Sequence, residues 1–204
     1  MRFRRGIARV CLLLAIAAVT GVAAWMTTAA LSASYETICW EAENHNTIKA
    51  PLFVGPRAGH SDDAAPTKAG PSGGKFVRSD MKSENDSGGK VVYKVKVQGG
   101  TYALWGRRYW PSPLKGCANS FYLNVDGKRV GIFGEDPTYD AWIWTRLKKP
   151  DTIKLTPGVH TIEFEHREHG AIIDQILLTT RTRRWVPGGG SLRVKVTPGA
   201  VQKK

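Results

Sequence analysis

Three acidic residues have the types and spacing that could bind a cation. Glu41 and Glu43 are two positions apart in segment 37–43, so on a strand their side chains share one face. Asp174 lies in the mainly apolar segment 171–178, where a buried carboxylate needs an ion pair or a metal. Carboxylates brought together repel one another, and their oxygens suit Ca²⁺. The alternative is two solvated glutamates together with an Asp–Arg pair.

A second group combines arginines with aromatic rings just before Pro111-Ser-Pro113, at the end of a predicted strand. It consists of Arg107, Arg108, Tyr109 and Trp110. Loops at strand ends commonly carry binding residues, and arginine can pair with a carboxylate through two hydrogen bonds. For Arg108 the alternative is a structural ion pair with an acid such as Glu135 or Asp140.

Two tryptophans, Trp142 and Trp144, are candidates for an aromatic surface that contacts a ligand. They are two positions apart, so on a strand they lie on the same face. Aromatic rings offer a broad apolar surface to a ligand, but they fill protein cores equally well. At least one of the two can therefore belong to the core.

These residues fall on or beside segments that predict β-strands. Almost nothing after residue 35 has a helical pattern, whereas short stretches with polar–apolar alternation are separated by turn residues. Asp126-Gly127 predicts a two-residue hairpin. The expected strands are 37–43, 75–79, 90–97, 101–109, 120–125, 128–132, 142–147, 152–155, 159–165 and 171–179. About ten short strands indicate an all-β sandwich or barrel.

The ends of the chain differ from this middle part. Residues 1–9 are basic, 10–31 are apolar and 32–34 are small, which is the pattern of an export signal. A run of this length could also remain as a membrane anchor of about 20 residues. We therefore expect a signal peptide or anchor helix (1–33), one domain (34–180) that is secreted, periplasmic or anchored facing outward, and a basic flexible tail (181–204).

The net charge and the cysteines indicate which ligands the protein could bind and whether it could form a disulfide. The net charge of +13 falls to about +9 without the four arginines of residues 1–9, which favours anionic partners or serves as a solvated basic surface. Export argues against nucleic acid. In an oxidising compartment Cys39 and Cys117 could form a disulfide, and two buried free thiols are the alternative. The oligomeric state stays open.

Several motifs resemble, in order, carbohydrate-binding modules of families six and thirty-five, which have a galactose-binding-like jelly-roll fold. Glu41-Ala-Glu43 resembles their opening "EAE", and the last-strand motif "iDyI" has its counterpart at Ile173-Asp-Gln-Ile176. The other matching motifs are Gly73-Gly-Lys-Phe-Val77, Gly99-Gly-Thr-Tyr102 with Arg108-Tyr109, Asn124-Val-Asp-Gly127 and Gly158-Val-His-Thr-Ile162. The resemblance covers about 38–179 and implies a jelly-roll β-sandwich that binds sugars without catalysis.

The resemblance also implies roles for individual residues. It assigns a structural calcium ion to Glu41, Glu43 and Asp174, and a sugar-stacking platform to Trp142. Two positions depart from the pattern. Arg78-Ser79 stands where the family usually has a second aromatic residue, and Ile172 where it often has a ligand-binding asparagine. The usual sugar cleft would then be rebuilt or degenerate.

Three function classes follow from the sequence. The first is an exported, non-catalytic module that binds a polysaccharide or cell-surface glycan, with acidic glycans favoured by the arginines and the basic charge. The second is an envelope structural or protein-interaction module with a degenerate sugar cleft. The third, a glycan hydrolase or lyase, needs two carboxylates about 5–10 Å apart, and Glu135, Asp136 and Asp140 are its candidates.

Overall fold

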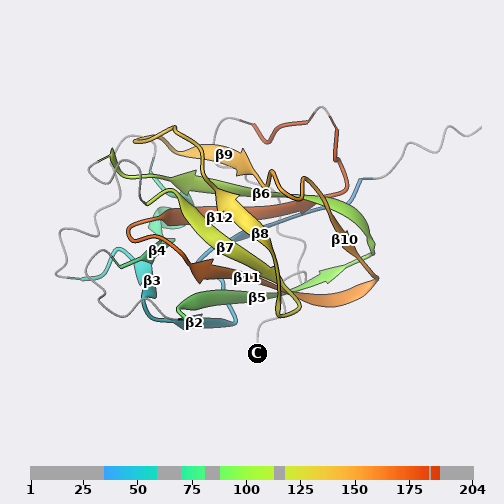
Figure 1. Cartoon of the computed structure of the whole chain (residues 1–204), viewed down its shortest axis with the longest axis horizontal. Coiled ribbons are helices and arrows are strands. Elements are labelled where there is room, and N and C mark those ends of the chain that lie inside the picture. Colours follow the sequence, from blue (N-terminus) through green and yellow to red (C-terminus); the bar gives the residue numbers. More distant parts are fainter. Residues whose placement is uncertain (1–34, 59–69, 81–87, 113–117, 184, 189–204) are drawn as a thin grey trace, which may run out of the picture. The chain divides into compact units, whose positions relative to one another are not determined.

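A computed structural model of the chain describes residues 35–58, 70–80, 88–112, 118–183 and 185–188. The regular elements in these ranges are β-strands, apart from the short 3-10 helix η2 (Ser72–Gly74), so the predicted all-β class is confirmed (Figure 1). The expected signal or anchor (1–33) and the end of the tail (189–204) lie outside the described residues. Within the described ranges, no helix has the length and apolar character needed to cross a membrane.

The described strands form two antiparallel sheets. The first has seven strands in the order β10-β6-β12-β4-β3, with β1 also beside β12 and β9 beside β6. Its strands are β1 (Thr37–Glu41), β3 (Leu52–Gly55), β4 (Phe76–Ser79), β6 (Gly100–Tyr109), β9 (Ile143–Arg146), β10 (Ile153–Leu155) and β12 (Ile172–Thr179). Strand β12 is central, so residues from β1, β6 and β4 lie directly beside it.

The second sheet has five described strands in the order β2-β5-β11-β7-β8. They are β2 (Thr47–Lys49), β5 (Lys90–Val97), β7 (Ser120–Val125), β8 (Lys128–Gly134) and β11 (Gly158–His166). The predicted hairpin between β7 and β8 is confirmed. Asp126 and Gly127 both have positive φ angles, 50° and 73°, as a tight hairpin turn requires.

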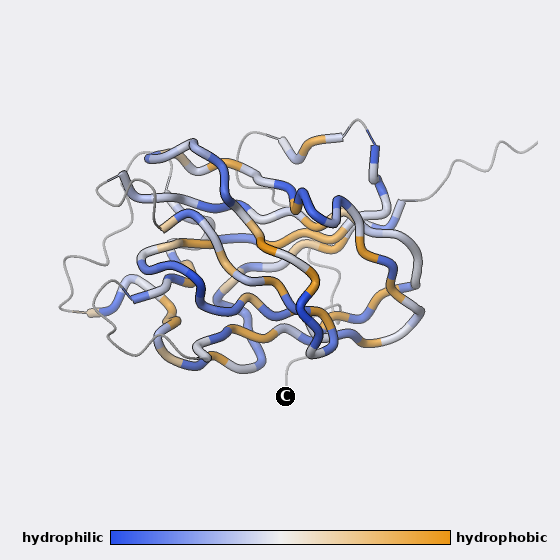
Figure 2. The backbone as a smooth tube through the Cα atoms, in the orientation of Figure 1, coloured by the Kyte–Doolittle hydropathy of each residue, from blue (hydrophilic) through white to orange (hydrophobic). Residues whose placement is uncertain are grey.

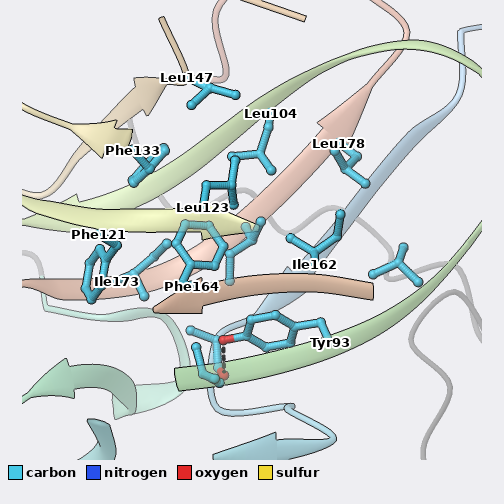
Figure 3. Packing of buried hydrophobic residues seen from close by; sticks show 14 of the residues in the cluster. Tyr93, Leu104, Phe121, Leu123, Phe133, Leu147, Ile162, Phe164, Ile173 and Leu178 are labelled. Atoms are coloured by element: carbon cyan, nitrogen blue, oxygen red, sulfur yellow. Dashed lines mark hydrogen bonds between the residues drawn. The ribbon is translucent and has the colours of Figure 1, made fainter. Parts of the chain in front are cut away.

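The inner faces of the two sheets form the main core. In β5, Val91, Tyr93, Val95 and Val97 are buried while the residues between them are more exposed, which is the period-two pattern of a half-buried strand. Figure 2 shows this alternation of hydropathy along the strands. Phe164 of β11 packs at right-angled geometry against Phe121 and Phe133 (Figure 3), so aromatic edges and faces fill the space between the sheets.

Some predicted boundaries differ from the observed ones. The strands β2 and β3 were not predicted, because three- and four-residue strands beside Pro51 are too short to show a period. Strand β1 ends at Glu41, and Trp142 precedes β9.

The start of the predicted basic tail packs against the first sheet. The rings of Trp185 and Trp105 meet edge to face at 6.3 Å, and Arg146 Nη1 donates to the carbonyl oxygen of Thr182 at 3.0 Å. The packed domain therefore continues beyond residue 180, past the boundary that the sequence predicted.

Candidate functional site

The face of the seven-stranded sheet opposite the main core carries a polar row between two apolar clusters. In the strand register, Glu41 of β1 lies beside Gln175 of β12, Gln175 beside Arg107 of β6, and Arg107 beside Trp144 of β9. On one side of this row is a cluster formed by Cys39, Ala103, Trp105 and Leu177. On the other is the aromatic patch, which we define as Phe76, Tyr109, Trp142 and Ile172.

The other two predicted acidic residues lie near Glu41 at the end of this row, and we call Glu41, Glu43 and Asp174 the acidic cluster. Ala42, between the two glutamates, donates its backbone N–H to the carbonyl oxygen of Asp174 at 2.7 Å. The turn at η2 covers the cluster, because Ser72 donates its N–H to Asp174 Oδ1 at 2.9 Å and its hydroxyl to Glu41 Oε1 at 3.0 Å. The strand pairing of β1 with β12 therefore positions two of the carboxylates, and the turn holds them from outside.

The charges of the acidic cluster are only partly compensated. Asp174, fully buried, forms an ion pair with the buried Arg107. Burial raises the pKa of Asp174 to about 7. The charge of Glu41 also raises this pKa, and together they outweigh the lowering effect of the ion pair with Arg107. Burial and the charge of Glu41 also raise the pKa of Glu43. Among the described residues, Glu41 Oε2 and Glu43 Oε2 are buried without a hydrogen-bond partner.

This arrangement partly fits the calcium ion that the resemblance implies. The two unpartnered oxygens of Glu41 and Glu43 are of the type that Ca²⁺ binds. Asp174, in contrast, already accepts hydrogen bonds from Arg107 and Ser72, which is the Asp–Arg pair of the alternative interpretation. No group of three histidine, cysteine or acidic side chains in the described part of the chain is arranged to hold a metal.

The aromatic patch surrounds the predicted platform Trp142. Trp142 is partly exposed and lies 5.4 Å from the ring of Tyr109, centroid to centroid, while Phe76 and Ile172 form the buried floor. The guanidinium of Arg107 lies 5.1 Å from the centre of the Trp142 ring. Arg107 therefore joins the aromatic patch to the acidic cluster, because the same side chain contacts Asp174.

Arg108 and Trp110 do not face this site. Successive residues of a strand point to opposite faces, so Arg108 points into the space between the sheets, where its side chain is fully buried beside Asp136. Trp110 is fully buried and belongs to the main core. Their burial is contrary to the expected ligand contacts. The ion pair foreseen as the alternative for Arg108 is present, with Asp136 in place of Glu135 or Asp140.

The other predicted ligand residues have separate surroundings. Tyr109 is almost buried in the aromatic patch, where its hydroxyl donates to Asp140 Oδ1 at 2.9 Å, and burial raises its pKa to about 12. Trp144 is partly exposed and packs against the other apolar cluster, beside Trp105 and Cys39. Trp142 and Trp144 thus contribute to two different surfaces of the same face.

Cys39 is a buried free thiol in this second apolar cluster. Burial, together with the charges of Glu41 and Asp174, raises the pKa of the thiol to about 12. Cys117, its expected disulfide partner, lies outside the described residues.

The carboxylates considered for glycan hydrolysis are engaged with other groups. Asp136 pairs with Arg108, Glu135 Oε1 lies 3.1 Å from Arg167 Nη2, and Asp140 accepts from Tyr109 and from the backbone N–H of Ser112. Each carboxylate thus has a contact that fits a structural role.

Sequence reasoning did not single out two polar residues of the site. Ser72 binds two carboxylates, and Gln175 Nε2 donates to Glu41 Oε1 at 2.7 Å. A usable signal was present for each: Ser72 precedes the turn glycines Gly73-Gly74, and Gln175 is a second polar residue in a buried strand. Gly73 has φ of 63°, and a Cβ added there would lie 3.6 Å from Glu43 Oε1, so a compact glycine turn fits against the cluster.

The fold is a β-sandwich of two antiparallel sheets, and similar solved structures share it. A family 35 carbohydrate-binding module from Paenibacillus barcinonensis matches over 69% of this chain and 96% of its own, at 18% identity and a TM-score of 0.50. One from Clostridium thermocellum matches over 70% of this chain and 97% of its own, at 18% identity and a TM-score of 0.49. The predicted likeness to family 35 is thus confirmed for the fold.

A third similar structure is a much longer enzyme, the exo-β-1,3-galactanase of Phanerochaete chrysosporium. It has 18% identity and a TM-score of 0.48 over 70% of this chain, which spans 29% of the galactanase chain. No protein-family model and no curated protein matches the sequence. The likeness to family six stays a prediction.

Proposed function

We propose that this protein is a non-catalytic carbohydrate-binding domain that acts outside the cytoplasm. The observation that carries the proposal is the partly exposed ring of Trp142, packed on Tyr109 and flanked by Arg107. A sugar ring presents an apolar C–H face that suits an aromatic ring, and polar groups around it recognise the hydroxyls. The fold shared with family 35 modules and the export-like first 33 residues support the same function.

We further propose that the preferred ligands are acidic glycans. A guanidinium can form two hydrogen bonds with the carboxylate of a uronic acid. Arg107 is the arginine next to the platform, so it takes the place of Arg108 in this proposal. The net charge of +13 would favour the approach of an anionic polysaccharide.

A structural Ca²⁺ ion belongs to the proposal as well. Glu41 and Glu43 would hold it through the oxygens that lack partners. Bound there, the ion would compensate the excess negative charge and fasten the end of β1 to the rest of the sheet. Asp174 would join as a ligand only where its contact with Arg107 is given up.

A glycan array probed with the purified protein tests the sugar proposal. We expect binding to uronic-acid-containing glycans, and a loss of about 2- to 13-fold in affinity for Trp142→Ala, because stacking on one aromatic ring contributes about 0.5–1.5 kcal/mol. Tyr122→Ala, which removes an aromatic residue from the five-stranded sheet, is the matched control and should bind normally. Equal binding by the wild type and Trp142→Ala would contradict the proposal.

Thermal unfolding with and without calcium tests the metal. An ion that binds only the folded state at 100 times its Kd stabilises by about 2.7 kcal/mol, so EDTA should lower the Tm. Glu43→Gln should remove most of this calcium effect, whereas Glu165→Gln on the other sheet should keep it. A melting curve unchanged by EDTA would remove the metal and leave the sugar proposal standing.

One observation favours a second candidate, an envelope protein-interaction module. Ile172 and Arg78 are 1% and 4% exposed, and they occupy positions where the resemblance implies an asparagine and an aromatic residue that contact sugar. The corresponding cleft would then lack two of its usual contacts. An array without glycan binding, combined with specific capture of a defined envelope protein, would favour this candidate.

A further inference from the structure

Trp142 stands at the end of an irregular segment that links β8 to β9. This segment, residues 135–142, which we call the platform loop, begins after Gly134 and ends before Ile143. It has no regular secondary structure, so its shape depends on side-chain contacts. The contacts at its first half come largely from one buried charged pair, Arg108 and Asp136.

Arg108 provides the donors of this pair. Its Nη1 donates to the carbonyl oxygen of Thr138 at 2.7 Å, its Nε donates to Thr145 Oγ1 at 3.0 Å, and its Nη2 pairs with Asp136. The guanidinium also lies 4.7 Å from the centre of the Trp110 ring. One fully buried side chain therefore ties the platform loop to β9 and to the main core.

Asp136 provides the acceptors. Besides Arg108, it accepts from the backbone N–H of Thr138 at 3.2 Å, from Trp110 Nε1 at 3.1 Å and from Thr145 Oγ1 at 3.1 Å. Both carboxylate oxygens thus have two donors each. A buried carboxylate held by four donors in this way specifies one arrangement of the groups it connects.

The far end of the platform loop is held by Asp140. Its backbone N–H donates to the carbonyl oxygen of Trp110 at 2.8 Å, and its Oδ1 accepts from Tyr109 at 2.9 Å and from the N–H of Ser112 at 2.9 Å. Asp140 has a φ of 55°, and so does Glu135 at the start of the loop. Non-glycine residues keep such backbone angles only when surrounding contacts hold them.

We propose that Arg108 and Asp136 are positioning residues: their buried pair fixes the platform loop and so presents Trp142 on Tyr109 in a form ready to bind. This inference rests on the proposed sugar-binding function. A surface that is ordered before binding loses less conformational entropy when the ligand arrives, so the network raises affinity without contacting the ligand. Arg108 would then contribute to recognition from the inner side of the sheet.

The test replaces both charges together, Arg108→Met with Asp136→Leu, so that neither partner is left buried and unpaired. We expect the double variant to remain folded, with amide hydrogen exchange at residues 136–141 at least 10-fold faster and glycan affinity at least 10-fold weaker. Nuclear Overhauser contacts between the rings of Tyr109 and Trp142 should weaken. Affinity is measured well below the Tm, so that a loss of global stability does not affect it.

Two further variants separate positioning from other effects. Glu165→Gln, which removes the exposed pair with Arg129 on the other sheet, should leave both the loop exchange and the affinity unchanged. Trp142→Ala should weaken glycan binding while exchange at 136–141 stays slow. An unchanged affinity in a double variant with a mobile loop would reduce the pair to a structural role and overturn the proposal.

The failure of the sugar proposal is distinguishable from the failure of this one. If the wild type binds no glycan on the array, the proposed function is wrong. The ring contacts between Tyr109 and Trp142, and the exchange of the platform loop, still report on positioning. If the ring contacts and the loop exchange of the double variant match those of the wild type, the positioning role of Arg108 and Asp136 is wrong as well.

Discussion

Arg107 and Arg108 are neighbours in β6, and each forms a buried pair with an aspartate, but on opposite faces of the sheet. Arg108 and Asp136 lie on the inner face, where both carboxylate oxygens have two hydrogen-bond donors. Arg107 and Asp174 lie on the outer face, where Glu41 and Glu43 add further negative charge. Arg108 thus pairs with a carboxylate whose oxygens all have donors, whereas Arg107 lies in a group that includes two carboxylate oxygens without partners among the described residues.

The difference shows which of two similar pairs is the better candidate for a functional site. A buried carboxylate whose two oxygens each accept two hydrogen bonds has little capacity left for a ligand. The outer pair is accompanied by two buried carboxylate oxygens without partners among the described residues and by a partly exposed tryptophan. Uncompensated carboxylates beside a partly exposed aromatic ring are typical of a ligand-binding site.

The largest effect expected from this comparison is that of Asp136→Ala on stability. The substitution leaves the fully buried Arg108 without its counter-charge, and breaking a buried pair in this way costs about 3–5 kcal/mol. Urea unfolding at pH 7 measures the loss. A cost below about 1 kcal/mol would mean that the inner network is not the closed, stabilising one described above.

The equivalent change on the outer face, Asp174→Asn, should cost less, about 1–2 kcal/mol. It removes the partner of Arg107, but it also removes one negative charge from the acidic cluster, where the charge of Glu41 acts against that of Asp174. The same urea measurement in EDTA compares the two variants directly. Equal losses for Asp136→Ala and Asp174→Asn would remove the proposed distinction between the faces.

The pH dependence of stability should separate the two pairs further. The pKa of Asp174 is raised to about 7 in the folded protein, against about 3.9 in an unfolded chain. The folded state then binds more protons, so the contribution of Asp174 to stability falls as the pH rises from about 4 to 7. Glu43, whose pKa is also raised, acts in the same direction.

Urea unfolding of the wild type and Asp174→Asn from pH 4.5 to 7.5, in EDTA, measures this contribution. We expect the stability difference between the two proteins to shift in favour of Asp174→Asn as the pH rises. Parallel curves over this range would show that the carboxyl of Asp174 titrates normally in the folded protein.

The sequence predicted the features that depend on neighbouring residues better than those that depend on contacts between distant segments. The two-residue periodicity of 90–97 and the turn Asp126-Gly127 predicted β5 and the β7–β8 hairpin, because local patterns determine them. Local pattern alone was sufficient in these places. For Glu41, Glu43 and Asp174 the residues left two interpretations open, and the grouping of the three followed from the family resemblance, because pairing of the first strand with the last has no local signal.

The roles of the two arginines could not be assigned in the same way. Arg107 and Arg108 are identical in type and adjacent, and only the register of β6 in the sheet decides which of them faces the core. The arginine that the sequence analysis matched to the family motif, Arg108, is the one that faces the core. The packing of Trp185 on Trp105 had no local signal either, because it joins segments 80 residues apart.

A partly exposed pair, His160 and Asp126, provides the reference for the two buried pairs, and its expected effect is the smallest. His160 Nδ1 lies 2.7 Å from Asp126 Oδ2, and this hydrogen bond raises the pKa of His160 and lowers that of Asp126. A raised histidine pKa stabilises the fold fully below about 6.5, the unfolded value, and the gain disappears as the pH rises through the folded pKa. The lowered pKa of Asp126 gives stability above about 3.9 that is lost on acidification through its folded value. The pair therefore contributes most between these limits.

Because the Asp126 side chain is 49% exposed, His160→Gln should cost no more than about 1 kcal/mol at pH 5.5 and almost nothing at pH 8.5. Thermal unfolding at the two pH values, with 0.5 M NaCl as a further condition that screens the pair, measures it. A loss of the same size at both pH values would assign the effect to packing of the imidazole ring. A loss as large as that of Asp136→Ala would mean that the burial of an ion pair does not determine how much stability is lost when the pair is broken.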